Sequence, residues 1–453
     1  MIPGKVGMYT CGMTVYDYAH IGHGRKYVTD DILKRALIYN GYEVKHVQNV
    51  TDVGHLVSDA DSGEDKMEKG AKKTGKTVWE VAEFYEKHFY ASMEKLNIIN
   101  PDVVCKATEH IAEQQELIEK LFVNGFAYDT PEAVYFDVTK DPGYGALTGQ
   151  KLADKKKAVR EEVETGEYKK NPQDFALWFK RVGRFTDHSM HWASPWGDGF
   201  PGWHIECSAM SMKYLGEQFD IHTGGEDHIP VHHPNEIAQS EGASGKRPFV
   251  NYWLHTAFLT VDGTKMSKSL GNFYTLEDVE KRAVDPLALR YFYLGAHYKS
   301  ALNFTWEALT AAQNSLNKLK EQVFAAKSQK DRTVLSQEKS QKVDMFQQNF
   351  KDAINDDLNT PQALAVLWSV LKSNIPSEDK YDLAINFDEV LGLRLAQATV
   401  EFSVPSEIQD LITQRENFRQ RGQFNEADEV RLKIENMGFK VLDSEKGTIV
   451  KPS

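Results

Sequence analysis

Residues 9–25, with the sequence YTCGMTVYDYAHIGHGR, place the strongest constraint on how this chain can fold. Met8, Tyr9 and Thr10 can close a short strand. Apolar residues then recur at helical spacing until Gly41 interrupts the pattern, at Val28, Ile32, Leu33, Ala36 and Leu37. Such a strand-to-helix turn presents backbone N–H groups and the positive end of a helix, and glycine lets a phosphate approach them. The stretch therefore predicts a phosphate-binding turn in an α/β fold.

The turn contains the sequence HIGH, which alone leaves two interpretations open. His20, Gly22 and His23 can hold a nucleotide, or the two histidines can simply cap the following helix. A second motif, GTKMSKSLGN at residues 263–272, forms a hydroxyl-rich loop after the apolar run 253–261. We expect that run to be one buried strand ending at an Asp-Gly turn. The loop residues of interest are Lys265, Met266, Ser267, Lys268 and Ser269. An early HIGH followed by a late KMSKS resembles the two nucleotide signatures of class I aminoacyl-tRNA synthetases.

The composition agrees with a multidomain enzyme, because 453 residues exceed one ordinary core and suggest about three domains. With 41% hydrophobic and 26% charged residues the chain is globular, and it has no apolar run long enough for a membrane span or signal peptide. We therefore expect a cytoplasmic protein without a membrane partner. Its three cysteines, Cys11, Cys105 and Cys207, are too few for a disulfide framework and fit a reducing compartment. The net charge of −12 argues against indiscriminate nucleic-acid binding, although a local basic track can still bind phosphates.

Between the two motifs, strand and helix signals alternate. Residues 44–49 read as a second strand, and the polar residues 58–77 as a mobile loop. Thr77 and Glu80 form a capping box that predicts the start of a long helix, and residues 111–122 predict another.

From about Ala133 the pattern changes to a short strand, near residues 134–138, followed by a Lys/Glu-rich segment at 151–170. We interpret residues 125–190 as an insertion between the two halves of the nucleotide fold, the connective-peptide region that the resemblance implies. The lysines of this segment are more typical of a solvated surface than of a dedicated RNA site.

Four residues from distant segments could bind a metal ion. Cys207, His232 and Glu236 offer soft, borderline and hard donors, and His232 and Glu236 are four apart, on one face of a helix. Cys11 would complete four ligands. Spacing leaves two alternatives open, since His233 could replace His232, and the set could equally be two buried thiols beside a polar helix.

The segments YTCG, GWHIECSAM and HHPNEIAQSE resemble the zinc-ligand segments of cysteinyl-tRNA synthetases, and the similarity extends over essentially the whole chain. It implies one zinc ion bound by Cys11, Cys207, His232 and Glu236. It also implies an amino-acid pocket that contains Gly12, Thr14, Thr51, Trp203, His204 and Asp227, with Asp227 as the partner of the substrate ammonium group. The chain departs from the family at residues 53–55, where Asp-Asp-Lys is common, and at Pro234, where Glu is common. These departures affect fine substrate contacts. Related synthetases also usually carry a short leader, so we expect a trimmed or naturally short N-terminus.

The resemblance also implies the chemistry. Class I enzymes of this kind join an amino-acid carboxylate to the α-phosphorus of ATP, release pyrophosphate and pass the acyl group to the terminal ribose of tRNA. Such chemistry needs positioning and charge neutralisation more than a protein nucleophile. We expect His20, Gly22 and His23 to hold the phosphates and the KMSKS lysines to close over them, with Mg²⁺ accompanying ATP. The expected partners are L-cysteine, ATP and tRNA(Cys), and the expected state is a monomer.

The C-terminal third is expected to be helical. Thr275 with Asp278, and Pro286, mark helix starts, and residues 306–327 and 361–371 read as helices of a bundle. The tail has two helical segments broken at Gly422 and a possible hairpin.

In the family that this chain resembles, the tail module reads the anticodon. The matching positions are Arg419, Phe424, Asp428 and Asp443. An arginine, an aromatic ring and two acids suit the recognition of unpaired bases. Alternatively, Phe424 belongs to a core and the aspartates cap helices or turns.

Taken together, the sequence predicts a Rossmann-like class I catalytic domain at residues 1–300, with its insertion near 125–190. An α-helical bundle at 301–400 and a small α+β anticodon-binding module at 401–453 follow. Two rival functions remain: an ATP-dependent ligase that attaches cysteine to an amino sugar, and a non-catalytic tRNA-binding paralogue. The first lacks the tail module, and the second would be expected to lose HIGH or KMSKS residues.

Overall fold

The computed structural model describes residues 2–54, 66–149, 168–327, 334–398, 406–444 and 447–452. Strand β1 (Lys5–Thr10) lies in the middle of a five-stranded parallel sheet of order β3-β2-β1-β8-β9. The other strands are β2 (Glu43–Val50), β3 (Val103–Lys106), β8 (Phe219–Gly225) and β9 (Val250–Thr256). The strand order reverses direction at β1. Ligands of open α/β sheets bind at the carboxyl ends of the strands at such a switch point.

Helix α1 (Ile21–Tyr39) follows β1, as the sequence predicts, and packs in the largest hydrophobic cluster through Val28, Ile32, Leu33 and Ala36. It also buries five charged side chains, Arg25, Lys26, Asp30, Asp31 and Lys34. Arg25 donates to the carbonyl oxygens of Ala257 and Phe258, at 2.9 and 2.8 Å. Because buried charges need partners, α1 is tied by them to segments far away in the sequence.

The single strand expected over residues 253–261 is wrong. The chain forms β9, then leaves the sheet at Ala257 and Phe258, and β10 (Leu259–Val261) belongs to a separate three-stranded sheet with β11 (Thr264–Lys265) and β12 (Leu302–Phe304). The two connecting residues bond outside the five-stranded sheet. Arg25 donates to both of their carbonyl oxygens, the Ala257 N–H donates to the Tyr298 carbonyl oxygen at 2.9 Å, and the Phe258 carbonyl oxygen also accepts from the Leu302 N–H at 3.1 Å.

The loop expected over residues 58–77 is also partly wrong. Residues 55–65 lie outside the described part of the chain, but the remainder contains helix α2 (Lys66–Thr74). Helix α3 (Val78–Lys95) begins at Thr77, whose hydroxyl accepts from the Glu80 N–H at 3.2 Å while the Glu80 carboxylate accepts from the Thr77 N–H at 2.8 Å. The predicted capping box is therefore confirmed.

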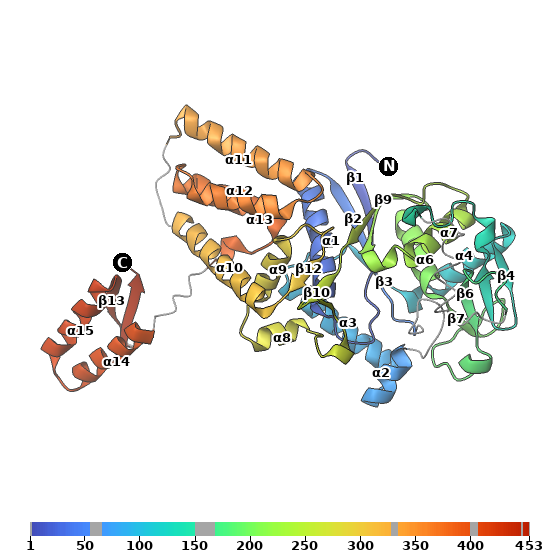
Figure 1. Cartoon of the computed structure of the whole chain (residues 1–453), viewed down its shortest axis with the longest axis horizontal. Helices are drawn as coiled ribbons and strands as arrows, with labels where there is room; N and C mark the ends of the chain where they lie inside the picture. The colour runs from blue at the N-terminus through green and yellow to red at the C-terminus, as the bar shows by residue number, and fades with distance from the viewer. Residues whose placement is uncertain are drawn as a thin grey trace. The chain divides into compact units, whose positions relative to one another are not determined.

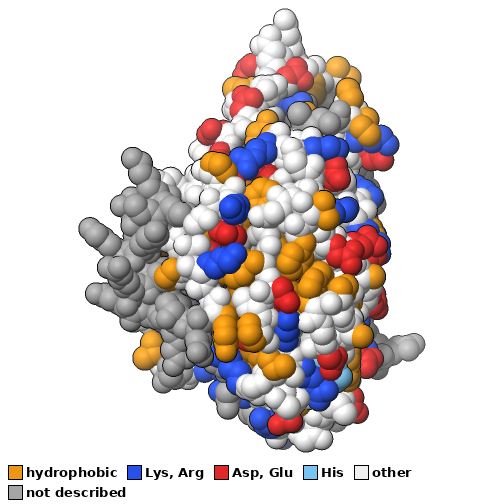
Figure 2. All heavy atoms as spheres, turned by 90° about the vertical axis from the view of Figure 1, so that its right-hand side faces the viewer, with side chains coloured by type: hydrophobic (Ala, Val, Ile, Leu, Met, Phe, Trp, Pro, Cys, Tyr) orange, Lys and Arg blue, Asp and Glu red, His pale blue; other side chains and the backbone are white. Residues whose placement is uncertain are grey.

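Between β3 and β8 lie helices α4 (Ile111–Val123) and α6 (Trp203–Leu215) and an antiparallel sheet. That sheet has the order β4-β5-β6-β7 and consists of β4 (Ala127–Asp129), β5 (Ala133–Phe136), β6 (Phe175–Lys180) and β7 (Gly199–Pro201). The Lys/Glu-rich segment falls mainly on residues 150–167, outside the described residues. Figure 2 looks onto the side of the molecule that is at the right of Figure 1, and basic, acidic and hydrophobic side chains are interspersed on the part of that face that the structure describes.

After the KMSKS loop come α8 (Leu276–Lys281) and α9 (Pro286–Leu294), which begin after Thr275 and Asp285 as N-caps. They are followed by α10 (Trp306–Lys327), α11 (Gln337–Asn355), α12 (Thr360–Lys372) and α13 (Ser377–Leu391), which pack as a bundle (Figure 1). Their buried leucines, valines and phenylalanines join the same cluster as α1, so the bundle supports the HIGH helix directly.

The chain divides into two compact units, Met1–Ala396 and Gln397–Ser453. The second unit consists of α14 (Ser406–Gln420), α15 (Phe424–Asn436) and an antiparallel hairpin of β13 (Phe439–Ser444) and β14 (Gly447–Pro452). Its own core contains Ile408, Val430, Ile434, Val441 and Val450. The predicted helix break at Gly422 and the predicted hairpin are confirmed. No described helix combines the length and the apolar character needed to cross a membrane.

Candidate active site and metal centre

The expected site residues of the first unit gather at the carboxyl ends of the central strands. Cys11 and Gly12 follow β1, Thr51 follows β2, and Asp227 lies in a short 3₁₀ turn (Glu226–His228) after β8. The remaining donors come from α6, which contains Cys207, and from α7 (His232–Ser244). The topology therefore brings together segments that are distant in sequence.

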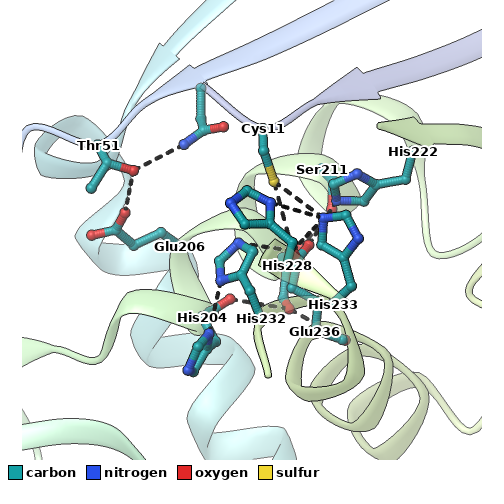
Figure 3. Close-up of polar contacts among 12 residues, drawn as sticks. Cys11, Thr51, His204, Glu206, Ser211, His222, His228, His232, His233 and Glu236 are labelled. Atoms are coloured by element: carbon teal, nitrogen blue, oxygen red, sulfur yellow. Dashed lines mark hydrogen bonds and ion pairs between the residues drawn. The ribbon is translucent and has the colours of Figure 1, made fainter. Parts of the chain in front are cut away.

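Cys11, Cys207, His232 and Glu236 are all buried, and one possible ligand atom from each lies within 4.8 Å of the others. Figure 3 shows the Cys11 sulfur directed toward Glu236 and several histidines. The distance from Cys11 Sγ to Glu236 Oε1 is 3.9 Å, and that from His232 Nε2 to the same oxygen is 3.0 Å. Two thiols, an imidazole and a carboxylate are a donor set that zinc accepts.

A second set, Cys11, His222, His233 and Glu236, is equally close. Both ring nitrogens of His233 already have partners, because Nδ1 lies 2.8 Å from His255 Nε2 and Nε2 lies 3.3 Å from His228 Nδ1. His232 differs. Its Nδ1 lies 2.8 Å from His204 Nδ1, and its buried Nε2 faces Glu236 Oε1 at 3.0 Å, inside the donor cluster. A ring nitrogen that faces other donor atoms, with the second nitrogen oriented by a neighbour, is typical of a metal-binding histidine. The residues present therefore fit a zinc ion better through the first set.

The two thiols of the cluster have pKa values that are shifted in opposite directions. Burial raises the pKa of Cys11, but the hydrogen bond from Cys207 and the nearby His222 and His232 lower it well below its ordinary value. The hydrogen bond with Cys11 and burial raise the pKa of Cys207. Burial would lower the pKa of His232, yet Glu236 and Cys11 raise it to about 10. Negative charge on Cys11 and positive charge on His232 therefore stabilise each other inside the cluster.

A hydrogen-bond chain connects the expected amino-acid pocket. The Gly12 N–H donates to Asn49 Oδ1 at 2.7 Å, Asn49 Nδ2 donates to Thr51 Oγ1 at 3.1 Å, and Thr51 Oγ1 donates to Glu206 Oε2 at 3.1 Å. A Cβ on Gly12 would lie 1.6 Å from the Asn49 carbonyl oxygen, so only glycine fits there. Thr14 pairs with Thr51 through an isolated parallel bridge.

The Trp203 ring, at the start of α6, stacks on His232, with ring centroids 4.3 Å apart. His204 is buried and touches His232 as described above. Asp227 is half-exposed, and its charge raises the pKa of His20 against the larger effect of burial. Asp227 is therefore close enough to the HIGH motif to act on its electrostatics.

His20 and His23 form a reciprocal cap at the start of α1. Each ring Nδ1 accepts from the backbone N–H of the other residue at 3.2 Å, and the rings stack with centroids 3.6 Å apart. Burial lowers the pKa of His20 to about 4 and that of His23 well below its ordinary value, so both rings are neutral at pH 7. A Cβ on Gly22 would lie 2.9 Å from the His20 ring. The two histidines therefore do cap α1, as one of the two interpretations expected. Capping is compatible with ligand binding, because the turn also presents the N-terminus of α1, where phosphates bind.

The KMSKS loop lies against this turn. Lys268 forms an ion pair with Asp17, and the Ile21 N–H donates to the Tyr274 carbonyl oxygen at 2.9 Å. Lys265 is exposed, and Met266 packs partly against the main core. The Ser267 N–H donates to Asn272 Oδ1 at 2.8 Å, and Ser269 lies in the 3₁₀ turn Lys268–Leu270, although its side chain is outside the described atoms. The fold therefore joins the two signature motifs.

The proposed anticodon residues all lie in the second unit. Phe424 is 65% exposed at the start of α15, and Asp428 is exposed one turn later on the same helix. Arg419 lies near the end of α14. Asp443 lies in β13, with its side chain outside the described atoms. The alternative of a buried Phe424 is excluded, and Asp428 lies inside the helix and not at its cap.

Four residues of the site were not singled out from the sequence: Asp17, Glu206, His228 and His255. Asp17 and Glu206 are each next to or near a motif, but nothing in the local pattern distinguishes them from surface acids. Pro234 is the third residue of α7, where its missing N–H costs no helix bond.

Comparison with known proteins decides the family. The family described as tRNA synthetases class I (C) catalytic domain matches residues 1–314, and the DALR domain family matches residues 349–374. A protein of Treponema denticola named cysteine–tRNA ligase is 46% identical, over 98% of this chain and 94% of that protein. Cysteine–tRNA ligase 1 of Burkholderia lata is 47% identical, over 98% of this chain and 92% of that protein. The chain belongs to the cysteine–tRNA ligase family of class I synthetases. The resemblance inferred from the motifs is thus confirmed.

Solved structures agree with the class I fold of this family member. The structure of Mycobacterium tuberculosis methionyl-tRNA synthetase in complex with methionyl-adenylate superposes with a TM-score of 0.60 at 16% identity, and covers 90% of this chain and 94% of that chain. At this identity the likeness concerns the fold alone. The predicted fold class is confirmed by it together with the parallel sheet and the helical C-terminal region.

Proposed function

We propose that this protein is a cysteine–tRNA ligase, which activates L-cysteine with ATP and transfers it to tRNA(Cys). The observation that carries the proposal is the buried donor cluster of Cys11, Cys207, His232 and Glu236 beside the joined HIGH and KMSKS motifs. A thiol-binding centre next to a nucleotide site suits an enzyme that activates cysteine. The names of the relatives support the same function.

Within this proposal, Cys11, Cys207, His232 and Glu236 hold one zinc ion and His204 orients His232. Bound zinc would lower the pKa of the substrate thiol and bind thiolate far better than a neutral hydroxyl. The protein residues do the rest of the selection. Trp203 stacks on His232 and covers the cluster, while Gly12, Thr14 and Thr51 form the opposite wall and Asp227 receives the substrate ammonium group.

For activation, His20, Gly22 and His23 hold the phosphates of Mg²⁺-bound ATP at the N-terminus of α1. Lys265 and Lys268 neutralise charge that accumulates on the leaving pyrophosphate, and Met266, Ser267 and Ser269 shape their loop. Because both histidines are neutral, they act as hydrogen-bond donors and not as charges. The ion pair between Lys268 and Asp17 keeps the loop close to the turn when the lysine is not on phosphate.

The domain organisation proposed is a catalytic domain at residues 1–300 with its insertion near 125–190, a helical bundle at 301–400 and an anticodon-binding module at 401–453. Arg419, Phe424, Asp428 and Asp443 contact the anticodon in this proposal. The exposed Phe424 ring is suited to stack on an unpaired base. We further propose that the protein acts in the cytoplasm as a monomer.

The test is pyrophosphate exchange measured separately with each amino acid, followed by charging of purified tRNA(Cys). We expect exchange with cysteine, far less with serine, and transfer to tRNA(Cys). Zinc is measured by elemental analysis of the same samples. Exchange with cysteine but attachment to an amino sugar instead of tRNA would support the rival ligase, and absence of exchange with every amino acid would support a non-catalytic protein.

A further inference from the structure

Helix α1 contains a buried ion pair that the proposed chemistry does not use. Lys26 Nζ lies 2.9 Å from Asp30 Oδ2, one helical turn later, and the two side chains are only 11% and 3% exposed. Removing two charges from water is costly, and a buried pair is weak evidence for a stabilising role. The geometry around Lys26 indicates what else it does.

Lys26 also contacts the backbone of the first zinc ligand. Its Nζ donates to the Cys11 carbonyl oxygen at 2.5 Å. The same peptide group is held on its other side, because the Gly12 N–H donates to Asn49 Oδ1 at 2.7 Å. The Cys11 N–H in turn donates to the Thr223 carbonyl oxygen at 3.1 Å, on strand β8. Polar contacts therefore hold both peptide groups that flank the Cys11 Cα.

Fixing both peptide groups fixes the direction of the Cα–Cβ bond between them, and with it the range of positions open to the sulfur. Figure 3 shows the result, with Cys11 at the end of β1 and its sulfur facing the histidines and Glu236. A charged donor makes a stronger hydrogen bond than a neutral one, and Asp30 keeps the ammonium group of Lys26 in place.

We propose that Lys26 is a positioning residue for Cys11: it holds this ligand in register with the metal centre and thereby couples the HIGH helix to the thiol-binding site. The proposal rests on the proposed function, because it assumes that Cys11 binds zinc. Only five residues lie between His20 and Lys26 on one chain segment, so a displacement of α1 at the nucleotide site would be transmitted to the Cys11 peptide.

The same helix supplies a matched control. Lys34 is also buried, lies two turns after Lys26, donates to the Asn100 carbonyl oxygen at 3.0 Å and pairs with Asp102 at 3.3 Å. It makes no contact with a proposed zinc or substrate residue in the described part of the chain. A purely structural role for buried lysines of α1 would make the two positions equivalent.

The experiment compares Lys26→Met, the double variant Lys26→Met with Asp30→Leu, and Lys34→Met. The double variant replaces the ion pair by apolar side chains and removes the unpaired Asp30 charge, so it keeps the test valid if the single variant folds poorly. The readouts are zinc affinity by competition with a chelator, the KM for cysteine and for ATP in pyrophosphate exchange, and the thermal unfolding midpoint.

We expect both Lys26 variants to lose roughly 10- to 100-fold in zinc affinity, as for other residues that orient metal ligands, with a raised KM for cysteine. The Lys34→Met protein should keep its zinc affinity even if its unfolding midpoint falls. A folded double variant with unchanged zinc affinity and an unchanged KM for cysteine would overturn the inference. If the unaltered protein bound no zinc, the proposed function would fail first, and this inference with it.

Discussion

Replacing Lys268 by alanine separates the catalytic role of the KMSKS loop from its structural role. In the structure, Lys268 is 53% exposed, pairs with Asp17 and lies 4.8 Å from the centre of the Phe273 ring. An exposed ion pair stabilises a protein by about 0.2–1 kcal/mol. If the variant lost only this pair with Asp17, the loop would be less well ordered and the reaction rate would fall by at most about fivefold.

A contact used mainly in the transition state has a larger effect. Removing one hydrogen-bond donor of this kind, which stabilises the transition state, costs ~10²- to 10³-fold in rate, or about 2.7–4 kcal/mol. We therefore expect Lys268→Ala to slow cysteine-dependent pyrophosphate exchange by that factor, with little change in the KM for cysteine and in thermal stability. The two explanations differ by more than an order of magnitude, which the assay resolves easily.

The matched control is Lys281→Ala on α8. Lys281 is 73% exposed and pairs with Asp278 at 3.3 Å. The Lys281→Ala variant therefore loses a comparable surface ion pair outside the site. Its exchange rate should stay within about twofold of the original, because surface pairs contribute little. If Lys268→Ala also remained within fivefold, the lysine would have no place in the transition state, and the reasoning from its position would be refuted.

Three further outcomes are expected. Deleting the residues after Val404 should preserve cysteine-dependent pyrophosphate exchange and sharply reduce tRNA charging; normal charging by the truncated protein would remove the anticodon assignment. Gly22→Ala places a Cβ 2.9 Å from the His20 ring, so it should disturb the reciprocal cap, cost about 0.5–2 kcal/mol of stability and raise the KM for ATP; an unchanged KM would argue against phosphate binding at this turn. Burial lowers the pKa of His46 from 6.5 to about 3, so the folded state binds fewer protons than the unfolded chain, and stability present above pH 6.5 should be lost as the pH falls toward 3. His46→Gln should flatten this loss in unfolding midpoints measured across that range, and an identical pH dependence would contradict the assignment.

The sequence determined the elements whose signals are local. Thr77 with Glu80 marks the start of α3, Pro286 lies at the start of α9, and apolar spacing outlines α1 and α10. These patterns depend on neighbours three or four residues apart, so they can be recognised without knowledge of the rest of the fold. The motifs also determined the family, because their residues and their order along the chain are specific.

Local sequence patterns gave a wrong prediction where residues that are distant in the sequence determine the backbone conformation. Residues 253–261 read as one strand because they are apolar, but β9 ends at Thr256, and the next two residues bond to Arg25 from α1 and to the backbone of residues 298–302. A hydrophobic pattern reports average burial and carries no information about a side chain that arrives from more than two hundred residues away.

Only the tertiary structure decided which donors meet. Cys11, Cys207 and Glu236 come from the end of β1, from α6 and from α7, and the sheet order β3-β2-β1-β8-β9 is what brings them to one edge. The same is true of Lys26, which a sequence pattern assigns to solvent as readily as to the interior. Its contact with the Cys11 carbonyl oxygen exists because β1 and α1 pack together, and the favourable energy of such a contact depends on burial, which a linear sequence does not specify.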